Sequence, residues 1–282
     1  MESLLSVAFD NLSSFDGAKI KKGLKQVEGL LAQICLSGPS SPRKPSAGRG
    51  RDQEQASRKG LSDLSGDPAF REFFKLQEGF EWNIAQRLLT TLDWLVVRGG
   101  DGQYDLLIVN ALDLIQGVLL LHPPSKALFA RSVHMNLLLD LLEPINCPAI
   151  QSAAIITLVV ALLDMPQNMR VFEQLDGLLT VTSLFKSRET GREVKFRLTE
   201  FLYFYLTPEA PPSPGKPAQV AGGNGNNKNG EARADRPGQG QGGDATLSVE
   251  EKKLLLEHYL PGVVDQLLKD LDTYKPFGGV LS

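Results

Sequence analysis

The chain has 282 residues and a formal net charge of −3, with 22% of its residues charged. This balance excludes a large basic surface for nucleic acid or for an anionic membrane. Only two cysteines occur, Cys35 and Cys147, which excludes a disulfide framework and a four-cysteine zinc site. The longest apolar run, from Ala153 to Leu163, is too short to span a bilayer. We therefore expect a protein of a reducing compartment, the cytoplasm or the nucleus, without membrane insertion.

Residues 1–36 are predicted to form helices that pack on the rest of the chain. Apolar residues recur at steps of three and four between positions 16 and 36, the pattern of one helical stripe. The stripe consists of Ile20, Leu24, Val27, Leu31 and Ile34. The lysines of this segment lie off the stripe, as on a solvated helix face.

Residues 37–66 are predicted to be a disordered loop. The run SGPSSPRKPSAGRGRDQEQASRKG has almost no apolar residue, so it cannot bury enough surface to offset the entropy of the chain. Within it, Ser41 opens a Ser-Pro-Arg-Lys sequence that fits the preference of cyclin-dependent kinases. Ser41 is therefore a candidate phosphorylation site, although motifs this short also arise by chance.

Residues 67–206 are predicted to form a series of helices. Asp67 and Pro68 supply an N-cap and a first-turn proline for the first of them. No segment in this range shows the sustained alternation of a half-buried strand. The predicted helices are 68–78, 81–98, 103–121, 125–132, 134–142, 148–164, 167–175, 177–187 and 191–206.

Two segments complete the chain. Residues 207–246 are rich in glycine, asparagine and proline, and are predicted to be a disordered low-complexity linker. Residues 247–282 are predicted to hold a last helix, 248–272, which a Ser-x-x-Glu capping box opens and Pro261 kinks or splits. Its predicted apolar face is Leu254, Leu255, Tyr259, Val263, Val264, Leu267 and Leu271.

The central helices repeat with a period of 43 residues. Residues 107–142 align with 150–185 without a gap, and Phe129 then falls on Phe172. A period near 43 with three helices per unit resembles armadillo or HEAT repeats, whose stacked units present a long protein-binding surface. Within one unit, Gly177 is expected to make the tight turn between two helices. The sequence therefore predicts an all-α, armadillo- or HEAT-like helical-repeat solenoid with two disordered linkers.

Residues with catalytic chemistry do not occur in catalytic arrangements. His122, His134 and His258 have no second histidine or cysteine at metal-ligand spacing. The chain also lacks the phosphate-binding glycine motifs and the Gly-x-Ser-x-Gly elbow of serine hydrolases. We therefore predict that the protein is not an enzyme, with no catalytic, cofactor-binding or metal-binding residue and no small-molecule substrate.

Basic and aromatic side chains gather in residues 184–209. Interleaved glutamates and the mildly acidic chain argue against nucleic acid and favour a protein partner. Four aromatics within five positions, 201–205, exceed what one buried helix face holds, and the last repeat is expected to have an uncovered outer face. The predicted partner-binding residues are Lys195, Arg197, Glu200, Phe201, Tyr203 and Tyr205. The alternative is that helix 248–272 covers this face within the same chain.

Three runs carry a more specific resemblance: SLFKSRETGREVKFRLTEFLYFYLTPE, the preceding PQNMRVFEQLDGLLTVTSLF, and the N-terminal FDNLSSFDGAKIKKGLKQVEGLLAQICL. They resemble the fungal cell division control protein 14 family of the septation initiation network. A phosphatase family of the same name is unrelated, and it needs an arginine six residues after its cysteine. Here the sixth residue after Cys35 is Ser41, and after Cys147 it is Ala153.

The resemblance implies a non-catalytic adaptor or regulatory subunit that binds a germinal-centre-type protein kinase. It further implies action late in mitosis at the spindle pole body, where the complex promotes septum formation and cytokinesis. The residues themselves lead only to a helical-repeat binding protein. A generic armadillo-like scaffold in trafficking or cytoskeletal organisation therefore remains the alternative.

Overall fold

The computed structural model describes residues 1–36, 64–99, 102–209 and 246–274. All regular structure within these ranges is helical, so the all-α prediction is confirmed. The helices are α1 (Glu2–Leu12), α2 (Gly17–Leu36), α4 (Pro68–Glu78), α5 (Ile84–Arg98), α6 (Asp105–Leu121), η1 (Pro123–Ala130), α7 (Ser132–Asp140), α8 (Pro148–Leu162), α9 (Pro166–Gln174), α10 (Gly177–Lys186), α11 (Arg192–Tyr205), α12 (Val249–Tyr259) and α13 (Val264–Tyr274).

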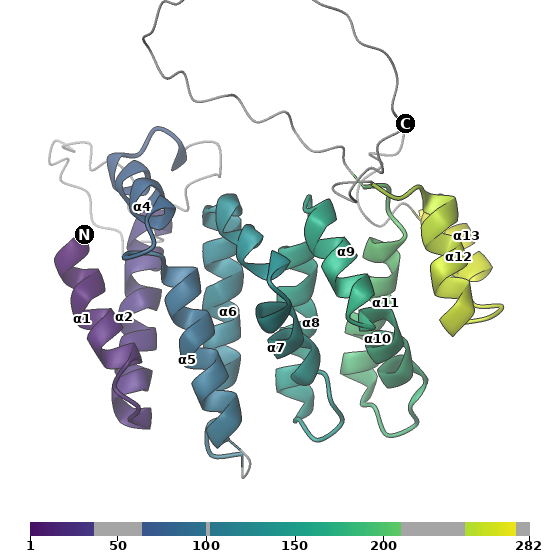
Figure 1. The fold of residues 1–282 in the computed structure, drawn as a ribbon, viewed down its shortest axis with the longest axis horizontal. Helices are drawn as coiled ribbons and strands as arrows, with labels where there is room; N and C mark the ends of the chain where they lie inside the picture. The colour runs from purple at the N-terminus through teal and green to yellow at the C-terminus, as the bar shows by residue number, and fades with distance from the viewer. Residues whose placement is uncertain (37–63, 100–101, 210–245, 275–282) are drawn as a thin grey trace, which may run out of the picture.

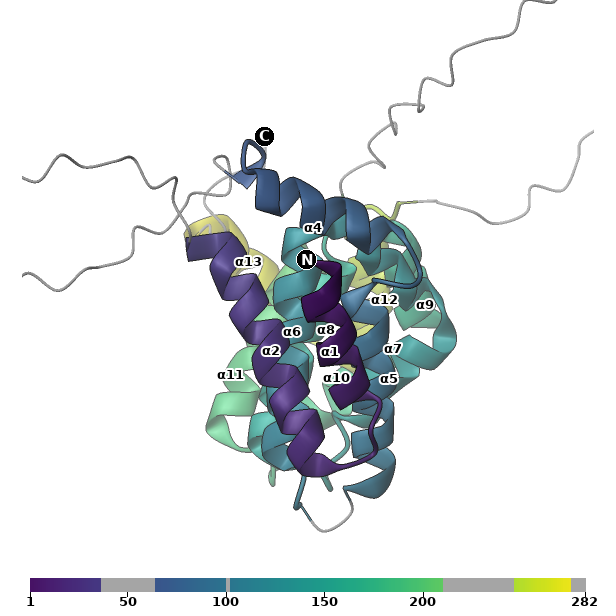
Figure 2. The same ribbon diagram turned by 90° about the vertical axis from the view of Figure 1, so that its left-hand side faces the viewer.

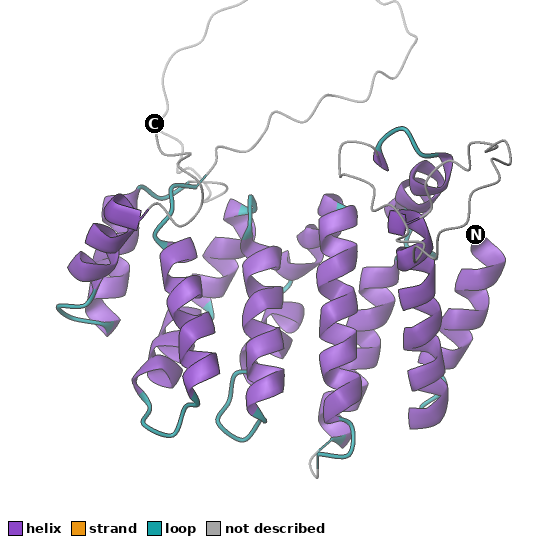
Figure 3. Ribbon diagram, turned by 180° about the vertical axis from the view of Figure 1, so that it is seen from behind, coloured by secondary structure: helices purple, strands orange, loops and turns teal. Residues whose placement is uncertain are grey.

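The helices stand side by side in two layers (Figure 1). One layer contains α2, α6, α8, α11 and α13, each packed on the next in that order, and is seen from behind in Figure 3. The other layer contains α1, α5, η1, α7, α9, α10 and α12. The α4 helix crosses the upper end of the row and contacts η1 (Figure 2). The α1–α2 pair and the α12–α13 pair therefore lie at opposite ends of the molecule.

The 43-residue spacing of the sequence reappears in the order of the helices. The α6, α8 and α11 helices begin at Asp105, Pro148 and Arg192. Phe129 and Phe172, which this spacing aligns, are both fully buried. All five predicted stripe residues of α2 are buried as well. Equivalent apolar positions thus form one continuous core between the layers.

Capping side chains and prolines decide where several helices begin. Asp67 accepts hydrogen bonds from the backbone N–H groups of Ala69 and Phe70, and α4 begins at Pro68 as predicted. The predicted helix 125–132 is instead the 3₁₀ helix η1, which starts at Pro123. Two successive prolines supply no backbone N–H there, and short 3₁₀ turns are common beside helix ends.

Gly177 serves close packing and not the turn itself. The residue with left-handed backbone is Asp176, with φ of 57°. The ring of Phe172 occupies the space that a Cβ atom at Gly177 would need. A larger residue at position 177 would therefore displace a fully buried aromatic ring.

The predicted linkers are too wide at two of their boundaries. Leu64 lies inside the predicted loop 37–66, yet only 3% of it is exposed and it joins the core. Glu209 lies inside the predicted linker 207–246, yet its side chain is only 6% exposed and makes ion pairs with Arg170 and Lys252. Ser41 lies outside the described residues, as do positions 37–63 and 210–245 of the two predicted linkers.

The C-terminal helix is split as predicted, with Pro261 and Gly262 between α12 and α13. Its predicted apolar face is partly wrong, because Leu254 is 72% exposed. The stripe that faces the stack contains Lys252, Leu256 and Leu260 instead. The buried side chain of Lys252 has polar partners on the stack, Glu209 and the carbonyl oxygen of Thr207.

Candidate partner-binding surface

The α11 helix lies between α8 and α13 and presents one buried stripe to the core. The stripe is Val194, Leu198, Phe201, Leu202 and Tyr205, at helical spacing. Phe201 packs against Phe172 of α9, with ring centroids 5.6 Å apart. Any partner must therefore contact the other sides of α11.

The structure divides the six predicted partner-binding residues into two groups. Phe201 and Tyr205 are fully buried within the chain's own core. The other four are partly exposed: Lys195, Arg197, Glu200 and Tyr203. The α11 helix can accommodate four closely spaced aromatic residues because α8 and α13 pack on different sides of it, and more than one face of the helix is therefore covered.

The expectation that α11 forms an uncovered end of the stack is wrong. The α13 helix packs on α11, and α12 packs on α10. The hydroxyl group of Tyr203 donates a hydrogen bond to the carboxylate of Asp270 on α13 at 3.3 Å. The alternative, in which the final helical segment covers this face, describes the structure.

A short edge of α11 stays accessible, and we name it the α11 edge: Lys195, Phe196, Arg197 and Glu200. Phe196 is 60% exposed. The guanidinium group of Arg197 lies 5.9 Å from the centre of the Phe196 ring and donates to Glu200 at 2.9 Å. An exposed aromatic ring beside an arginine is the composition of a protein-binding anchor. Phe196 was not among the predicted partner-binding residues. Its position between Lys195 and Arg197 in the sequence indicates an exposed side of the helix.

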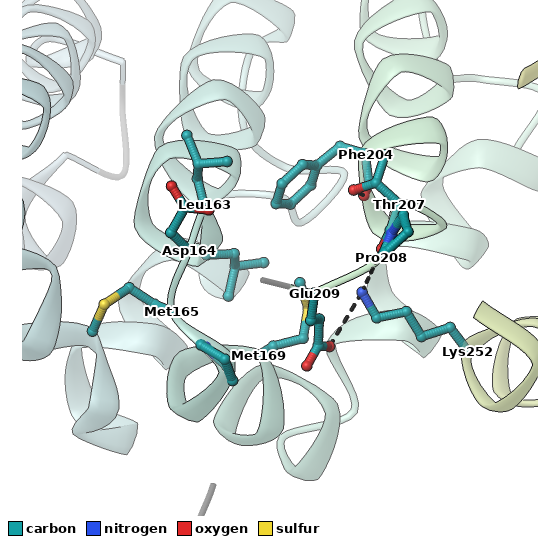
Figure 4. Close-up of a pocket in the computed structure, with 11 residues that line it drawn as sticks. Leu163, Asp164, Met165, Met169, Phe204, Thr207, Pro208, Glu209 and Lys252 are labelled. Atoms are coloured by element: carbon teal, nitrogen blue, oxygen red, sulfur yellow. Dashed lines mark hydrogen bonds and ion pairs between the residues drawn. The ribbon is translucent and has the colours of Figure 1, made fainter. Parts of the chain in front are cut away.

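Beyond the C-terminal end of α11, a network of charged side chains joins α12 to the stack. The Nζ atom of Lys252 lies 3.1 Å from Glu209 Oε1 and donates to the carbonyl oxygen of Thr207 at 3.0 Å. Glu209 also pairs with Arg170 of α9 at 2.6 Å. Figure 4 shows Lys252 reaching from α12 toward Glu209 and Thr207. Because Lys252 is only 1% exposed, these contacts replace its water shell.

Burial shifts the pKa values of the network. Burial lowers the pKa of Lys252, and nearby Glu209 opposes this shift. Burial raises the pKa of Glu173, while the hydrogen bond that Glu173 accepts from Tyr205 at 2.8 Å opposes the rise. The pKa of Tyr205 is raised, first by burial and then by the charge of Glu173. Each of these shifted groups has a hydrogen-bond or ion-pair partner within the chain, so the shifts reflect structural contacts.

The cavity next to this network is small. Its volume is about 40 Å³, and its lining includes Leu162, Met169, Phe204, Glu209 and Lys252 (Figure 4). Pockets that bind small molecules have volumes of roughly 300–1,000 Å³. The cavity is therefore too small for a metabolite.

Metal and membrane sites were also sought over the described ranges. No group of three or more histidine, cysteine or acidic residues there could hold a metal ion. No single helix of the described chain is long and apolar enough to cross a membrane; only α6 and η1 taken together pass that test, and they are bent by 119° at their junction.

Comparison with known proteins places this fold in a family. Residues 1–277 match the family of cell division control protein 14, described as a SIN component. The chain belongs to this family. It is 29% identical to cell division control protein 14 of Schizosaccharomyces pombe over 287 aligned positions, which cover 99% of this chain and 97% of the relative. No solved structure matches it. Family membership connects the chain with the cell cycle, septation and cytokinesis.

Proposed function

We propose that this chain is a non-catalytic adaptor that binds a germinal-centre-type protein kinase of the septation initiation network. In this role it promotes septum formation and cytokinesis at mitotic exit. The observation that carries the proposal is the match of residues 1–277 to a family of SIN components. The same match favours this role over that of a general scaffold in trafficking or cytoskeletal organisation.

The proposed fold type is an armadillo- or HEAT-like solenoid. Its support is the 43-residue spacing together with one buried side chain, Asn168, which is fully inaccessible to solvent. The amide of Asn168 donates to the carbonyl oxygen of Lys126 at 2.8 Å and to that of Ala161 at 2.7 Å. One side chain thus ties η1, α8 and α9, as expected for successive units of a repeat stack.

The proposed kinase contact is the α11 edge with Tyr203. Phe196 offers exposed apolar area, and Lys195 and Arg197 offer positive charge beside it. Phe201 and Tyr205 support this surface from below, because they are buried and cannot touch a partner. The contact is proposed to operate in the cytoplasm, and at the spindle pole body during mitosis.

Kinase binding is tested by co-purification of the full chain with mass-spectrometric identification of its partners. The double variant Phe196→Ala with Arg197→Glu is expected to retain no more than about one tenth of the kinase that the wild type retains. The reason is that it removes the exposed ring and reverses the charge beside it. The matched control is Arg71→Glu, an exposed arginine of α4 far along the row. Circular dichroism of each variant checks that the helices are intact.

Two results would contradict the proposal. If no germinal-centre-type kinase co-purifies with the wild-type chain, the adaptor role is wrong. If the kinase is retained at full strength by the double variant, the role stands but the α11 edge is not the contact surface. In that case the exposed sides of α6 and α8 in the same layer are the next surfaces to test.

Ser41 is proposed as a mitotic phosphorylation site. A phosphate group would add nearly two negative charges beside Arg43 and Lys44, and so change the charge of this segment without touching the core. Phosphopeptide mapping from mitotic cells should detect modified Ser41. Complete peptide coverage without the modification would contradict the proposal.

A further inference from the structure

The row of helices has two exposed ends, and each end has a leucine side chain that is largely exposed to solvent. At one end α1 and α2 have no further described helix beyond them, and at the other end lies α12 (Figures 1 and 2). Terminal units of helical-repeat proteins normally present a polar outer face. Here Leu4 of α1 is 61% exposed and Leu254 of α12 is 72% exposed. These two ends need not be equivalent, and their charges differ.

A groove of about 170 Å³ lies between α1 and α2. Leu4, Ala8 and Leu30 contribute apolar atoms to its lining. Gly29 also lines it, and a Cβ atom there would meet nothing within 4 Å. Two residues further along α2, on the opposite side, Leu31 approaches α6 at Gly117. The groove therefore faces away from the stack.

The rim of this groove is positively charged. Lys25 is part of its lining, and no lining residue is acidic. Lys22 precedes Gly29 by seven residues, or two helical turns, so it lies on the same side of α2. Both lysines are exposed, and neither forms a salt bridge with another described residue. The groove thus offers an apolar floor beside two lysines that form no ion pair with another described residue.

The outward face of α12 has the opposite charge. Leu254 lies two residues from both Lys252 and Leu256, which face the stack, so it points about 200° away from them. Around it, Glu250 and Glu251 are exposed. The neighbouring cation is already paired: Lys253 lies 2.6 Å from Asp265. This face is therefore an exposed leucine with acidic surroundings.

We propose that α12 of one copy of the chain docks into the α1–α2 groove of a second copy. Leu254 would enter the apolar groove, and Glu250 would approach Lys22 and Lys25. Pairing groove with groove would oppose lysines, and pairing α12 with α12 would oppose glutamates, so the charges select the head-to-tail contact. Because the two surfaces lie at opposite ends, successive copies would extend as a row and not close as a symmetric dimer. This self-association goes beyond the proposed kinase binding and does not depend on it.

The test is sedimentation velocity of the full chain over a range of concentrations. The wild-type sedimentation coefficient should rise with concentration. Gly29→Trp fills the groove and Leu254→Lys places positive charge on the outward face of α12, so each should sediment as a monomer throughout. The matched controls are Gly29→Ala, which adds one methyl group in open space, and Val133→Lys on α7, where the side chain is 63% exposed. Both controls should associate as the wild type does.

The decisive sample is an equimolar mixture of Gly29→Trp and Leu254→Lys. Each chain keeps one intact surface, so the mixture should form a dimer and nothing larger. A wild-type chain that stays monomeric up to about 1 mM, the weak limit of specific affinity, would overturn the proposal. Association that survives Leu254→Lys but not Gly29→Trp would overturn it in favour of groove-to-groove pairing. A mixture that remains monomeric would also overturn it.

Discussion

Lys252 of α12 carries a charge that is almost completely buried against the stack. Its ammonium group is held by Glu209 and by the carbonyl oxygen of Thr207, and its Nζ atom lies 5.3 Å from the centre of the Tyr205 ring. Glu209 is held in turn by Arg170 and by the backbone N–H of Leu247. A buried ion of this kind stabilises the fold only while all its partners are present.

Lys252→Ala should destabilise the protein by about 3 kcal/mol, because Glu209 loses one of its two cationic partners and the carbonyl oxygen of Thr207 loses its donor. Lys253→Ala, one position along, is the control: its partner Asp265 is exposed, and the free energy of unfolding should hardly change. Urea unfolding of both variants measures the difference. Equal effects of the two substitutions would show that burial of Lys252 is not what makes its charge important.

His122 should make stability depend on pH. Its side chain is 2% exposed, Nδ1 lies 2.8 Å from the Ser125 hydroxyl, and burial lowers its pKa below the ordinary 6.5, with Glu78 opposing the shift. Below pH 6.5 the unfolded chain therefore binds a proton that the folded chain resists, so stability falls as the pH falls through this window.

The measurement is the urea midpoint at pH 7.5 and at pH 5.5. The loss between these values should be smaller in His122→Gln than in the wild type, while His258→Gln, at an exposed position of α12, should keep the wild-type loss. An unchanged loss in His122→Gln would assign the pH dependence to other groups.

At the scale of single elements, α12 shows that apolar periodicity alone can give the wrong face. Lys252, Leu256 and Leu260 form the buried stripe, and Leu254 lies on the opposite side. A prediction that counts only apolar residues omits the lysine and moves the stripe around the helix. Substitutions along one helix can therefore establish its orientation.

Leu256→Ala should cost roughly 2–4 kcal/mol of stability, since the side chain is fully buried and its removal leaves a cavity. Leu254→Ala removes the same atoms from a position that is 72% exposed, and should cost less than about 0.5 kcal/mol. Thermal unfolding of the Leu256→Ala and Leu254→Ala variants measures both losses of stability. A larger loss in Leu254→Ala would mean that α12 is rotated as the sequence predicted.

Much of the fold was predictable because most helices bury a regular apolar stripe. In α2 the five predicted stripe residues are all buried, and Asp67 caps α4 at the predicted position. The candidate site was less predictable. Phe201 and Tyr205 look like exposed anchors until α9 and α13 are seen to flank α11. The counter-charge of Lys252 lies 43 residues earlier, beyond the reach of local periodicity.

At the scale of the whole molecule, the described residues on either side of positions 210–245 lie next to each other. Glu209 accepts a hydrogen bond from the backbone N–H of Leu247 at 3.1 Å, although 37 residues separate them in the sequence. The α12–α13 pair is therefore positioned by its contacts with the stack and not by the length of the connection.

Deletion of residues 212–242 should leave the melting temperature unchanged or slightly raised. The two ends of the connection are already adjacent, and a shorter loop loses less entropy on closure, with each halving of length worth about 0.6 kcal/mol. Differential scanning calorimetry of the full chain and the deletion variant checks this. A fall of several degrees would mean that the deleted residues contribute to the packing of the helices.

The same junction sets what would follow from proteolysis between Glu209 and Leu247. While the connection is intact, the tethered α12–α13 pair faces its docking surface at an effective concentration of the order of millimolar, and binding is intramolecular. A cut would leave every contact of Lys252 in place but turn docking into an association between two molecules. The fraction of molecules in which α12–α13 stays bound to α10 and α11 would then fall on dilution. A cleaved preparation would therefore behave as a two-component complex.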